Sequence, residues 1–227
     1  MNRQVSESYP IGVLLALVGG FLDAYTYLCR GGVFANAQTG NIVLFGLHLA
    51  QGEWGLSLSY LVPIAAFFFG VYVTESLKSR YKGRRGRLHW RQVTVAVESM
   101  VLLIVAFLPQ GDWDSLANIL VSFVCAMQVE SFRKLSGSPY ATTMCTGNLR
   151  SATENLYHFR RTGDGTFLRR FRQYAGIILF FIAGAAVGAH ATRRFCAEAV
   201  LFGLIGLAAV FLLMFREEMD EAGEEQK

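Results

Sequence analysis

The tripeptide Thr-Gly-Asn occurs twice in this chain, at Thr39–Asn41 and at Thr146–Asn148, each time before a short helix-forming run. Threonine and asparagine side chains can cap the free backbone N–H groups at a helix start, and glycine permits close backbone approach. A helix start also carries a partial positive charge, which suits an anion or a polar solute. The alternative is that both tripeptides merely cap buried helices. The predicted substrate-binding residues are Asp23, Gln38, Thr39, Gly40, Asn41, Thr146, Gly147 and Asn148.

Three acidic residues lie within or at the end of apolar runs, where an ionisable group is costly and faces a cavity or a partner. Asp23 is the strongest functional candidate of the three: it could relay a proton, bind a cation or orient the polar loop. The structural alternative is a contact between Asp23 and the backbone N–H groups of that loop. Glu98 lies beside Ser99, and an interhelical hydrogen bond is the default interpretation of this residue. Glu130, Arg150 and Glu98 are also the candidates for a coupling or orienting role. Glu130 either repeats the role of Asp23 or forms an interfacial ion pair with Arg133 or Lys134.

The second tripeptide differs from the first because charged residues follow it. Arg150 and Glu154 stand four positions apart, so they either pair on one helix face or leave Arg150 to meet an anion. Neither the four histidines nor the four cysteines show metal or redox spacing, and no nucleophile–base set is evident. We therefore expect no metal, no cofactor and no enzymatic activity.

The elements that carry these residues are apolar enough for a membrane. The chain has 227 residues, is 53% hydrophobic and has a mean hydropathy of +0.35. Spanning helices need roughly 17–25 apolar residues. Six runs approach or reach that length: Ile11–Cys29, Leu56–Thr74, Val93–Leu108, Leu116–Val129, Tyr174–Ala189 and Ala199–Phe215. The net charge of +4 comes from basic loops, which we read as an orientation signal rather than as a nucleic-acid surface.

The two tripeptides belong to a longer internal repeat with an offset of 107 positions. At this offset Asp23 falls on Glu130 and Gly19 falls on Ala126. Each half then reads as a long span, a polar stretch, Thr-Gly-Asn, a short helix and two more spans. The sequence predicts a tandem duplication with a first repeat at 1–110, a second at 111–216 and an acidic tail at 217–227.

The short helices, Asn41–Gln51 and Asn148–His158, have 11 residues each, or about 16 Å, roughly half the hydrocarbon thickness. They either re-enter the membrane or help to form a fourth crossing in each half. If the basic loop Lys78–Arg91 is cytoplasmic, the re-entrant arrangement leaves only Arg30, Arg193 and Arg194 outside, which satisfies the positive-inside tendency. We therefore predict an all-α membrane protein with six transmembrane helices, two re-entrant half-helices, an inverted-topology tandem repeat and both termini in the cytoplasm.

The stretches GGFLDAYTYL, FANAQTGNIVLFG and TTMCTGNLRSAT resemble the YoaK family of bacterial integral membrane proteins, a domain of unknown function. The resemblance covers Ile11 to Phe215. It implies a protein of the bacterial cytoplasmic membrane and supports the tripeptides, Gly20 and Asp23 as motif positions. It implies no substrate.

Two half-helix starts that meet near the midplane of an inverted repeat are typical of transporters. The sequence therefore predicts a secondary transporter or facilitator of a small polar or anionic solute in the lipid bilayer, with protons as a candidate coupling ion. The alternatives are a passive channel with the same pore, and a membrane scaffold or membrane enzyme. Small-residue faces suit either a homodimer interface or internal helix packing.

Overall fold

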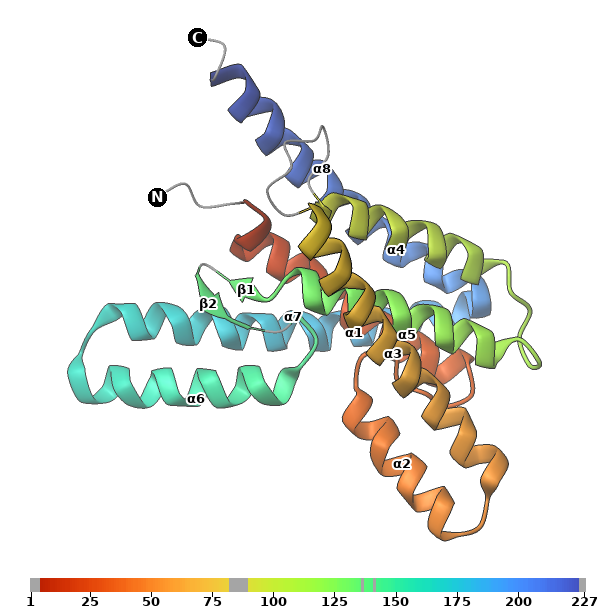
Figure 1. Cartoon of the computed structure of the whole chain (residues 1–227). Helices are drawn as coiled ribbons and strands as arrows, with labels where there is room; N and C mark the ends of the chain where they lie inside the picture. Colours follow the sequence, from red (N-terminus) through yellow and green to blue (C-terminus); the bar gives the residue numbers. More distant parts are fainter. Residues whose placement is uncertain (1–4, 82–89, 136, 141, 225–227) are drawn as a thin grey trace.

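The computed structural model describes residues 5–81, 90–135, 137–140 and 142–224, and helices dominate it (Figure 1). Most of the predicted basic loop, residues 82–89, lies outside the described residues, as do 225–227 of the acidic tail. The α-helices are α1 (Tyr9–Cys29), α2 (Gln38–Ala50), α3 (Trp54–Tyr81), α4 (Trp90–Ala106), α5 (Asp114–Ser131), α6 (Cys145–Thr162), α7 (Gly165–Phe195) and α8 (Leu201–Glu224). Short 3₁₀ helices cover η1 (Val5–Glu7) and η2 (Cys196–Val200), and β1 (Lys134–Leu135) pairs antiparallel with β2 (Ser138–Pro139).

The predicted helical architecture is confirmed, and four of the six apolar runs lie wholly within one long helix. Val93–Leu108 extends two residues past α4, and Ala199–Phe215 begins in η2. Among the described residues, three helical stretches are long and apolar enough to cross a membrane: Tyr9–Cys29, Trp54–Arg80 and Gly165–Phe215. The third stretch contains α7, η2 and residues 201–215 of α8. Helices α4 and α5, with 17 and 18 residues, carry the remaining two apolar runs and pack in the same bundle.

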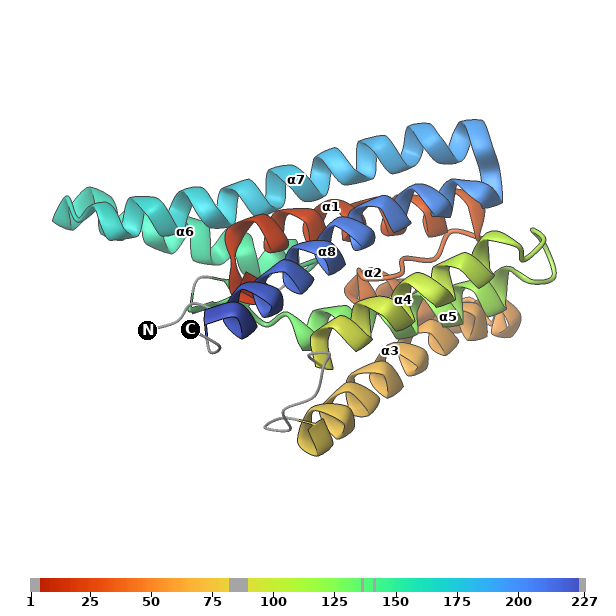
Figure 2. The same ribbon diagram turned by 90° about the horizontal axis from the view of Figure 1, so that it is seen from above.

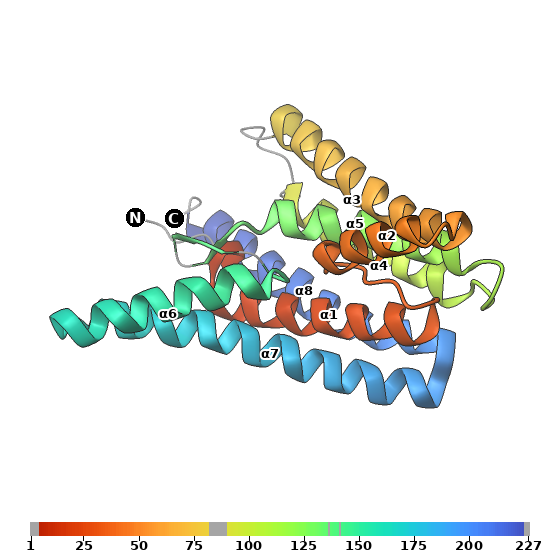
Figure 3. The same cartoon turned by 90° about the horizontal axis from the view of Figure 1, so that it is seen from below.

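Helices α1, α7 and α8 run side by side, and α3 crosses them obliquely (Figure 2). Helices α2 and α6 leave the bundle in different directions (Figure 1). Helix α1 begins at the end of the bundle where α8 ends, and α7 runs alongside α1. Helix α2 starts in the middle of the bundle and runs toward the end where α1 finishes (Figure 3). Helix α6 also starts in the middle but runs toward the end where α1 begins. Each is joined to the next long helix by a glycine in the left-handed region, Gly52 or Gly163.

Helix packing crosses between the two predicted repeats. Helix α1 of the first repeat packs along α7 of the second, and α5 of the second packs along α3 of the first. In the same way α1 contacts α8, and α5 contacts α4. Glycines lie where these helices cross, and there is no room for a side chain. A Cβ at Gly20 of α1 would overlap a carbonyl oxygen of α7, and a Cβ at Gly184 of α7 would overlap one of α1. A Cβ at Gly70 of α3 would overlap Phe123 of α5. Small residues at such crossings let backbones approach closely.

The core lies between α1, α4, α5 and α8, whereas the perimeter is apolar and exposed. Leu15, Leu22, Leu102 and Val121 are among the fully buried core side chains. Large apolar side chains cover the outer faces of the long helices, including Phe68, Phe69, Tyr72, Met100, Phe107, Leu179, Ile182, Val187, Ile205 and Leu212. A surface this apolar needs a nonaqueous environment, and a bilayer supplies one.

Candidate functional site where two helix starts meet

Asp23 lies in the interior of α1 and holds the loop that enters α2. The backbone N–H of Asn36 donates to Asp23 Oδ1 over 2.6 Å, and the side chain is only 5% exposed. The N–H groups of Ala35 and Ala37 also lie close to the carboxylate. Asp23 therefore satisfies the free donors that precede the helix start, which is the structural reading of this residue.

Asn41 does not cap α2, which corrects the prediction from the tripeptide. Helix α2 begins three residues earlier, at Gln38, and its N-cap Ala37 makes no side-chain cap bond. Asn41 is fully buried and clamps the preceding loop: its Oδ1 accepts from the Phe34 N–H (3.0 Å), and its Nδ2 donates to the Phe34 carbonyl (2.7 Å) and to Gln38 Oε1 (3.0 Å). Both ends of this amide are engaged, so Asn41 shapes the loop instead of presenting free groups to a solute.

The second half uses different residues for the same arrangement. Gln128 of α5 donates to Thr142 Oγ1 (3.4 Å), 14 positions later, as Asp23 of α1 binds Asn36, 13 positions later. The sequence offset of 107 matched Asp23 with Glu130 instead. It failed because the segment between α5 and α6 is longer than that between α1 and α2, which displaces the helix relative to the tripeptide. A glutamine inside the apolar run Leu116–Val129 was the available signal for this residue.

The two loops meet on one face of α1. A Cβ at Gly19 would overlap Thr143 of the second loop, and Asn36 of the first loop donates to the Gly19 carbonyl over 3.3 Å. Asp23 also lies within electrostatic range of Cys145, the first residue of α6. The structure therefore brings the starts of α2 and α6 together beside Asp23, as Figures 1 and 3 also show.

The remaining predicted binding residues divide into buried and exposed groups. Asn148, like Asn41, is buried, whereas Thr39, Thr146 and Gly147 are exposed in the first turns of their helices. Gln38, the first residue of α2, donates to the Ala35 carbonyl of the first loop, and Gly40 lies beside Phe34. Helix α6 begins at Cys145, and its N-cap Met144 makes no side-chain cap bond. The second tripeptide is thus a first helical turn, not a cap.

Two of the charged candidates lie away from this meeting point. Glu130 pairs with Arg133 (3.1 Å) and with Lys78 of α3 (3.7 Å) near the end of α5, which is the interfacial reading. Arg150 is exposed on α6, whose buried face is Asn148 and Ala152. Among the described ion pairs there is none between Arg150 and Glu154. Neither residue contributes to the site beside Asp23.

Glu98 departs from its default reading. Its neighbour Ser99 donates to the Val95 carbonyl of the same helix, so it does not bind Glu98. Within the described part of the chain, neither carboxylate oxygen of Glu98 has a hydrogen-bond partner, although the side chain is fully buried.

The charge distribution predicted only that Arg30 lies in an outer loop. In the structure its side chain is fully buried and holds the end of α4. Its guanidinium donates to the carbonyls of Val105, Leu108 and Pro109 at the end of α4, at 2.9–3.1 Å. It also binds Asp114 (3.0 Å) and the Tyr25 hydroxyl (2.9 Å). The sequence does not predict this burial, because a single arginine after an apolar run is typical of a charge at the membrane interface.

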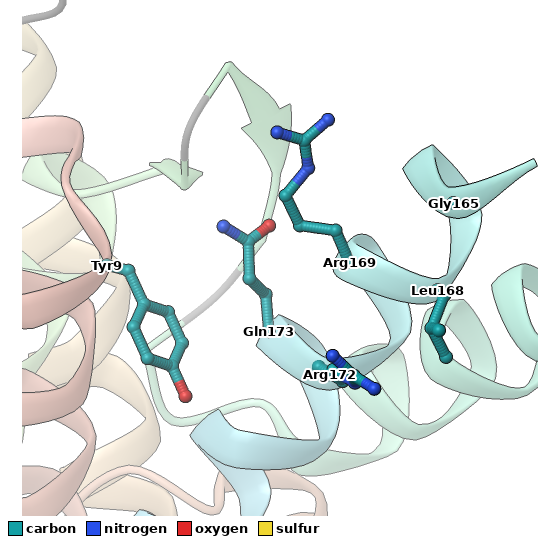
Figure 4. Close-up of a pocket in the computed structure, with 6 residues that line it drawn as sticks. All are labelled: Tyr9, Gly165, Leu168, Arg169, Arg172 and Gln173. Carbon is teal, nitrogen blue, oxygen red and sulfur yellow. The ribbon is translucent and has the colours of Figure 1, made fainter.

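A cavity of about 340 Å³ lies elsewhere, between the starts of α1 and α7 (Figure 4). Tyr9, Arg169, Arg172 and Gln173 line it together with Gly165 and Leu168. The two arginine side chains point away from one another, so they do not converge on one ligand. This cavity lies at the end of the bundle, whereas Asp23 lies in the interior of the bundle. The polar groups that meet at Asp23 are therefore the better candidate site. Among the described residues, no group of three or more His, Cys, Asp or Glu could hold a metal ion.

Comparison with known proteins gives the same picture. A family model described as "Protein of unknown function (DUF1275)" matches residues 11–214. The chain is 26% identical over 223 residues to the "UPF0700 transmembrane protein YoaK" of Bacillus subtilis (strain 168), covering 93% of this chain and 94% of the relative. No solved structure matches. The resemblance to the YoaK family is confirmed: this chain is a membrane protein and belongs to the DUF1275 family of proteins of unknown function.

Proposed function

We propose that this protein is a secondary transporter or facilitator that moves a small polar solute past the point where α2 and α6 begin. The observation that carries the proposal is that two helices start side by side in the bundle interior, beside a buried aspartate, and run to opposite ends (Figure 3). Non-helical backbone at membrane depth is tolerated where it lines a cavity or is buried in protein, and such broken helices are a recurrent transport site.

The exchange of helix partners supports an inverted repeat. Packing of α1 on α7 corresponds to packing of α5 on α3, and the contacts of α1 with α8 correspond to those of α5 with α4. Each repeat then crosses the membrane three times, which places α2 and α6 on opposite sides. Rocking of one repeat against the other would expose the meeting point to each side in turn.

The chemistry of the meeting point favours a polar solute over a strongly anionic one. The donors of the first loop are already taken by the Asp23 carboxylate, and a second negative charge beside it is unfavourable in a low-dielectric site. Acceptor oxygens without a partner in the described residues remain on Asn36, Gln128 and Thr143. These groups suit a solute that donates hydrogen bonds.

In the present conformation the meeting point is closed, because Thr143 packs against Gly19. Movement of a solute therefore requires the second loop to leave α1. A Cβ at Gly19 would lie 3.5 Å from Thr143 Cβ, within the range of disulfide-linked residues. We expect the double variant Gly19→Cys/Thr143→Cys, in a background without the four native cysteines, to form a disulfide that abolishes transport, with recovery on reduction.

The measurement is uptake of labelled amino acids, small carboxylates, sugars and inorganic anions into proteoliposomes, first with the parent protein and then with the locked variant. The matched controls are the reduced double variant and the single variant Thr143→Cys, which adds no Cβ at Gly19. We expect the single variant to keep its activity under oxidation. Accumulation against a gradient supports a transporter, whereas flux that only equilibrates supports the channel alternative. If the oxidised lock transports as well as the reduced protein, the route does not pass between α1 and the second loop. If the parent protein moves none of these solutes, the result favours a membrane scaffold over a transporter.

A further inference from the structure

Glu98 is the middle residue of α4 (Trp90–Ala106), about 12 Å from either end at 1.5 Å per residue. It is 0% exposed, and neither carboxylate oxygen has a hydrogen-bond partner in the described residues. Asp23, the other buried acid, is instead held by backbone N–H groups. The structure therefore contains two interior acids in different situations, one with donors and one without.

No positive charge faces Glu98 from the described residues of the elements packed around α4. Helix α5 presents Cys125, and residues 201–215 of α8 carry no ionisable side chain. Glu75 and Lys78 of α3 belong to the ion-pair cluster with Glu130 at the bundle end. The 3₁₀ helix η2, with Cys196 and Glu198, lies at the level of Val105, because Tyr25 contacts both Ala197 and Arg30. On α4 itself, Arg91 is two turns away, bound to Ser6 and Ser131.

An ionised carboxylate without a counter-charge is very costly in such a place, so the group must hold a proton or a cation. A metal cation needs several oxygen ligands, whereas a proton needs one lone pair. Among the described residues, no three His, Cys, Asp or Glu side chains come together that could hold a metal ion, at Glu98 or elsewhere. The surroundings of Glu98 therefore suit a proton and not a metal ion.

Cys125 connects Glu98 to the meeting point of the two loops. It lies within electrostatic range of both Glu98 and Asp23, and close to the Asn36 side chain. Asn36 is the residue whose N–H binds Asp23 and whose side chain binds the Gly19 carbonyl. A change of charge at Glu98 would thus reach the first loop through one intervening residue.

We propose that Glu98 binds and releases the coupling proton of this protein, while Asp23 remains the structural ligand of the first loop. The proton adds to a carboxylate oxygen from water and returns to water, with no other bond made or broken. The coupling role rests on the proposed transport function, but proton binding at Glu98 does not. Exchange with water requires a conformation in which α4 is accessible from one side of the bundle.

The test is infrared spectroscopy of the purified full chain in lipid, which needs no solute. At neutral pH we expect the carbonyl band of a protonated carboxylic acid that shifts in D₂O and loses intensity as the pH is raised. Glu98→Gln should remove the band, and Asp23→Asn should leave it. Glu98→Asp should keep a titrating band at an altered midpoint, so the assignment survives if the glutamine variant does not fold.

Three results would overturn the proposal: no such band in the parent protein, a band that persists in Glu98→Gln, or a band that neither shifts in D₂O nor titrates. The last would identify a sealed acid with no exchange. The oxidised Gly19–Thr143 lock tests transport without reference to Glu98, so failure of one proposal is distinguishable from failure of the other.

Discussion

Gly20→Ala is expected to destabilise the protein by about 3 kcal/mol or more, at or beyond the upper end of overpacking effects. Helix α1 crosses α7 at this glycine, and the new Cβ would overlap the carbonyl oxygen of Phe181 and press on the backbone of Ala185 at 3.0 Å. Backbone atoms cannot rotate away as a side chain would, so the two helices must separate. The measurement is thermal unfolding in detergent, together with the monodisperse fraction on size exclusion.

The matched control is Gly46→Ala in α2, where a Cβ would meet nothing within 4 Å. Alanine favours a helix over glycine by roughly 1 kcal/mol, so this variant should melt at or slightly above the parent temperature. Gly184→Ala, which presses on Leu17 from the other side of the same crossing, should repeat the effect of Gly20→Ala. Parent-like stability of both α1–α7 variants would show that these helices do not pack as described.

Arg30→Met should lower the free energy of unfolding by about 3–5 kcal/mol, the usual cost of removing one partner from a buried ion pair. Methionine can fill the space, but it leaves three carbonyls at the end of α4 and the Asp114 carboxylate without their donor. Unfilled acceptors at a buried helix end are costly. The measurement is denaturant unfolding of the purified protein.

Arg133→Met is the matched control, because Arg133 is 63% exposed in its pairs with Glu75 and Glu130. Exposed pairs contribute about 0–1 kcal/mol, so this variant should unfold almost as the parent does. Arg30→Lys should fall between, since an ammonium cannot reach all the acceptors that the planar guanidinium spans. Equal effects at positions 30 and 133 would contradict the clamp.

The sequence predicted the helices well and their contacts less well. The apolar runs predicted the six long helices, because the length and composition of a run can be read directly from the sequence. The tripeptides located the starts of α2 and α6 within three residues. The capping role predicted for Asn41 was wrong, since Asn41 binds a loop that the linear pattern does not place beside it.

The partners of the interior acids could not be predicted, because they depend on loop length and helix register. The longer segment before α6 shifts α5 so that Gln128, and not Glu130, meets the second loop. Arg30 binds residues 75–84 positions away, which no local pattern predicts. Glu98 was recognised as an intramembrane acid, but its lack of partners emerges only from packing.

Impermeant thiol labelling of Gly55→Cys and Gly165→Cys tests the proposed inverted repeat most directly. Gly55 lies in the first turn of α3, which follows α2, and Gly165 in the first turn of α7, which follows α6; a Cβ at either would meet nothing within 4 Å. Both glycines lie outside the left-handed region, so a cysteine is not strained there. Substituting Gly165 leaves the neighbouring Asp164 in place as the N-cap of α7. The hydrogen bond from the Thr166 N–H lowers the pKa of Asp164. In intact cells, without the four native cysteines, the cysteine at 55 should label from outside and that at 165 only after permeabilisation. Labelling of both from the same side would contradict the inverted repeat and the transport route built on it.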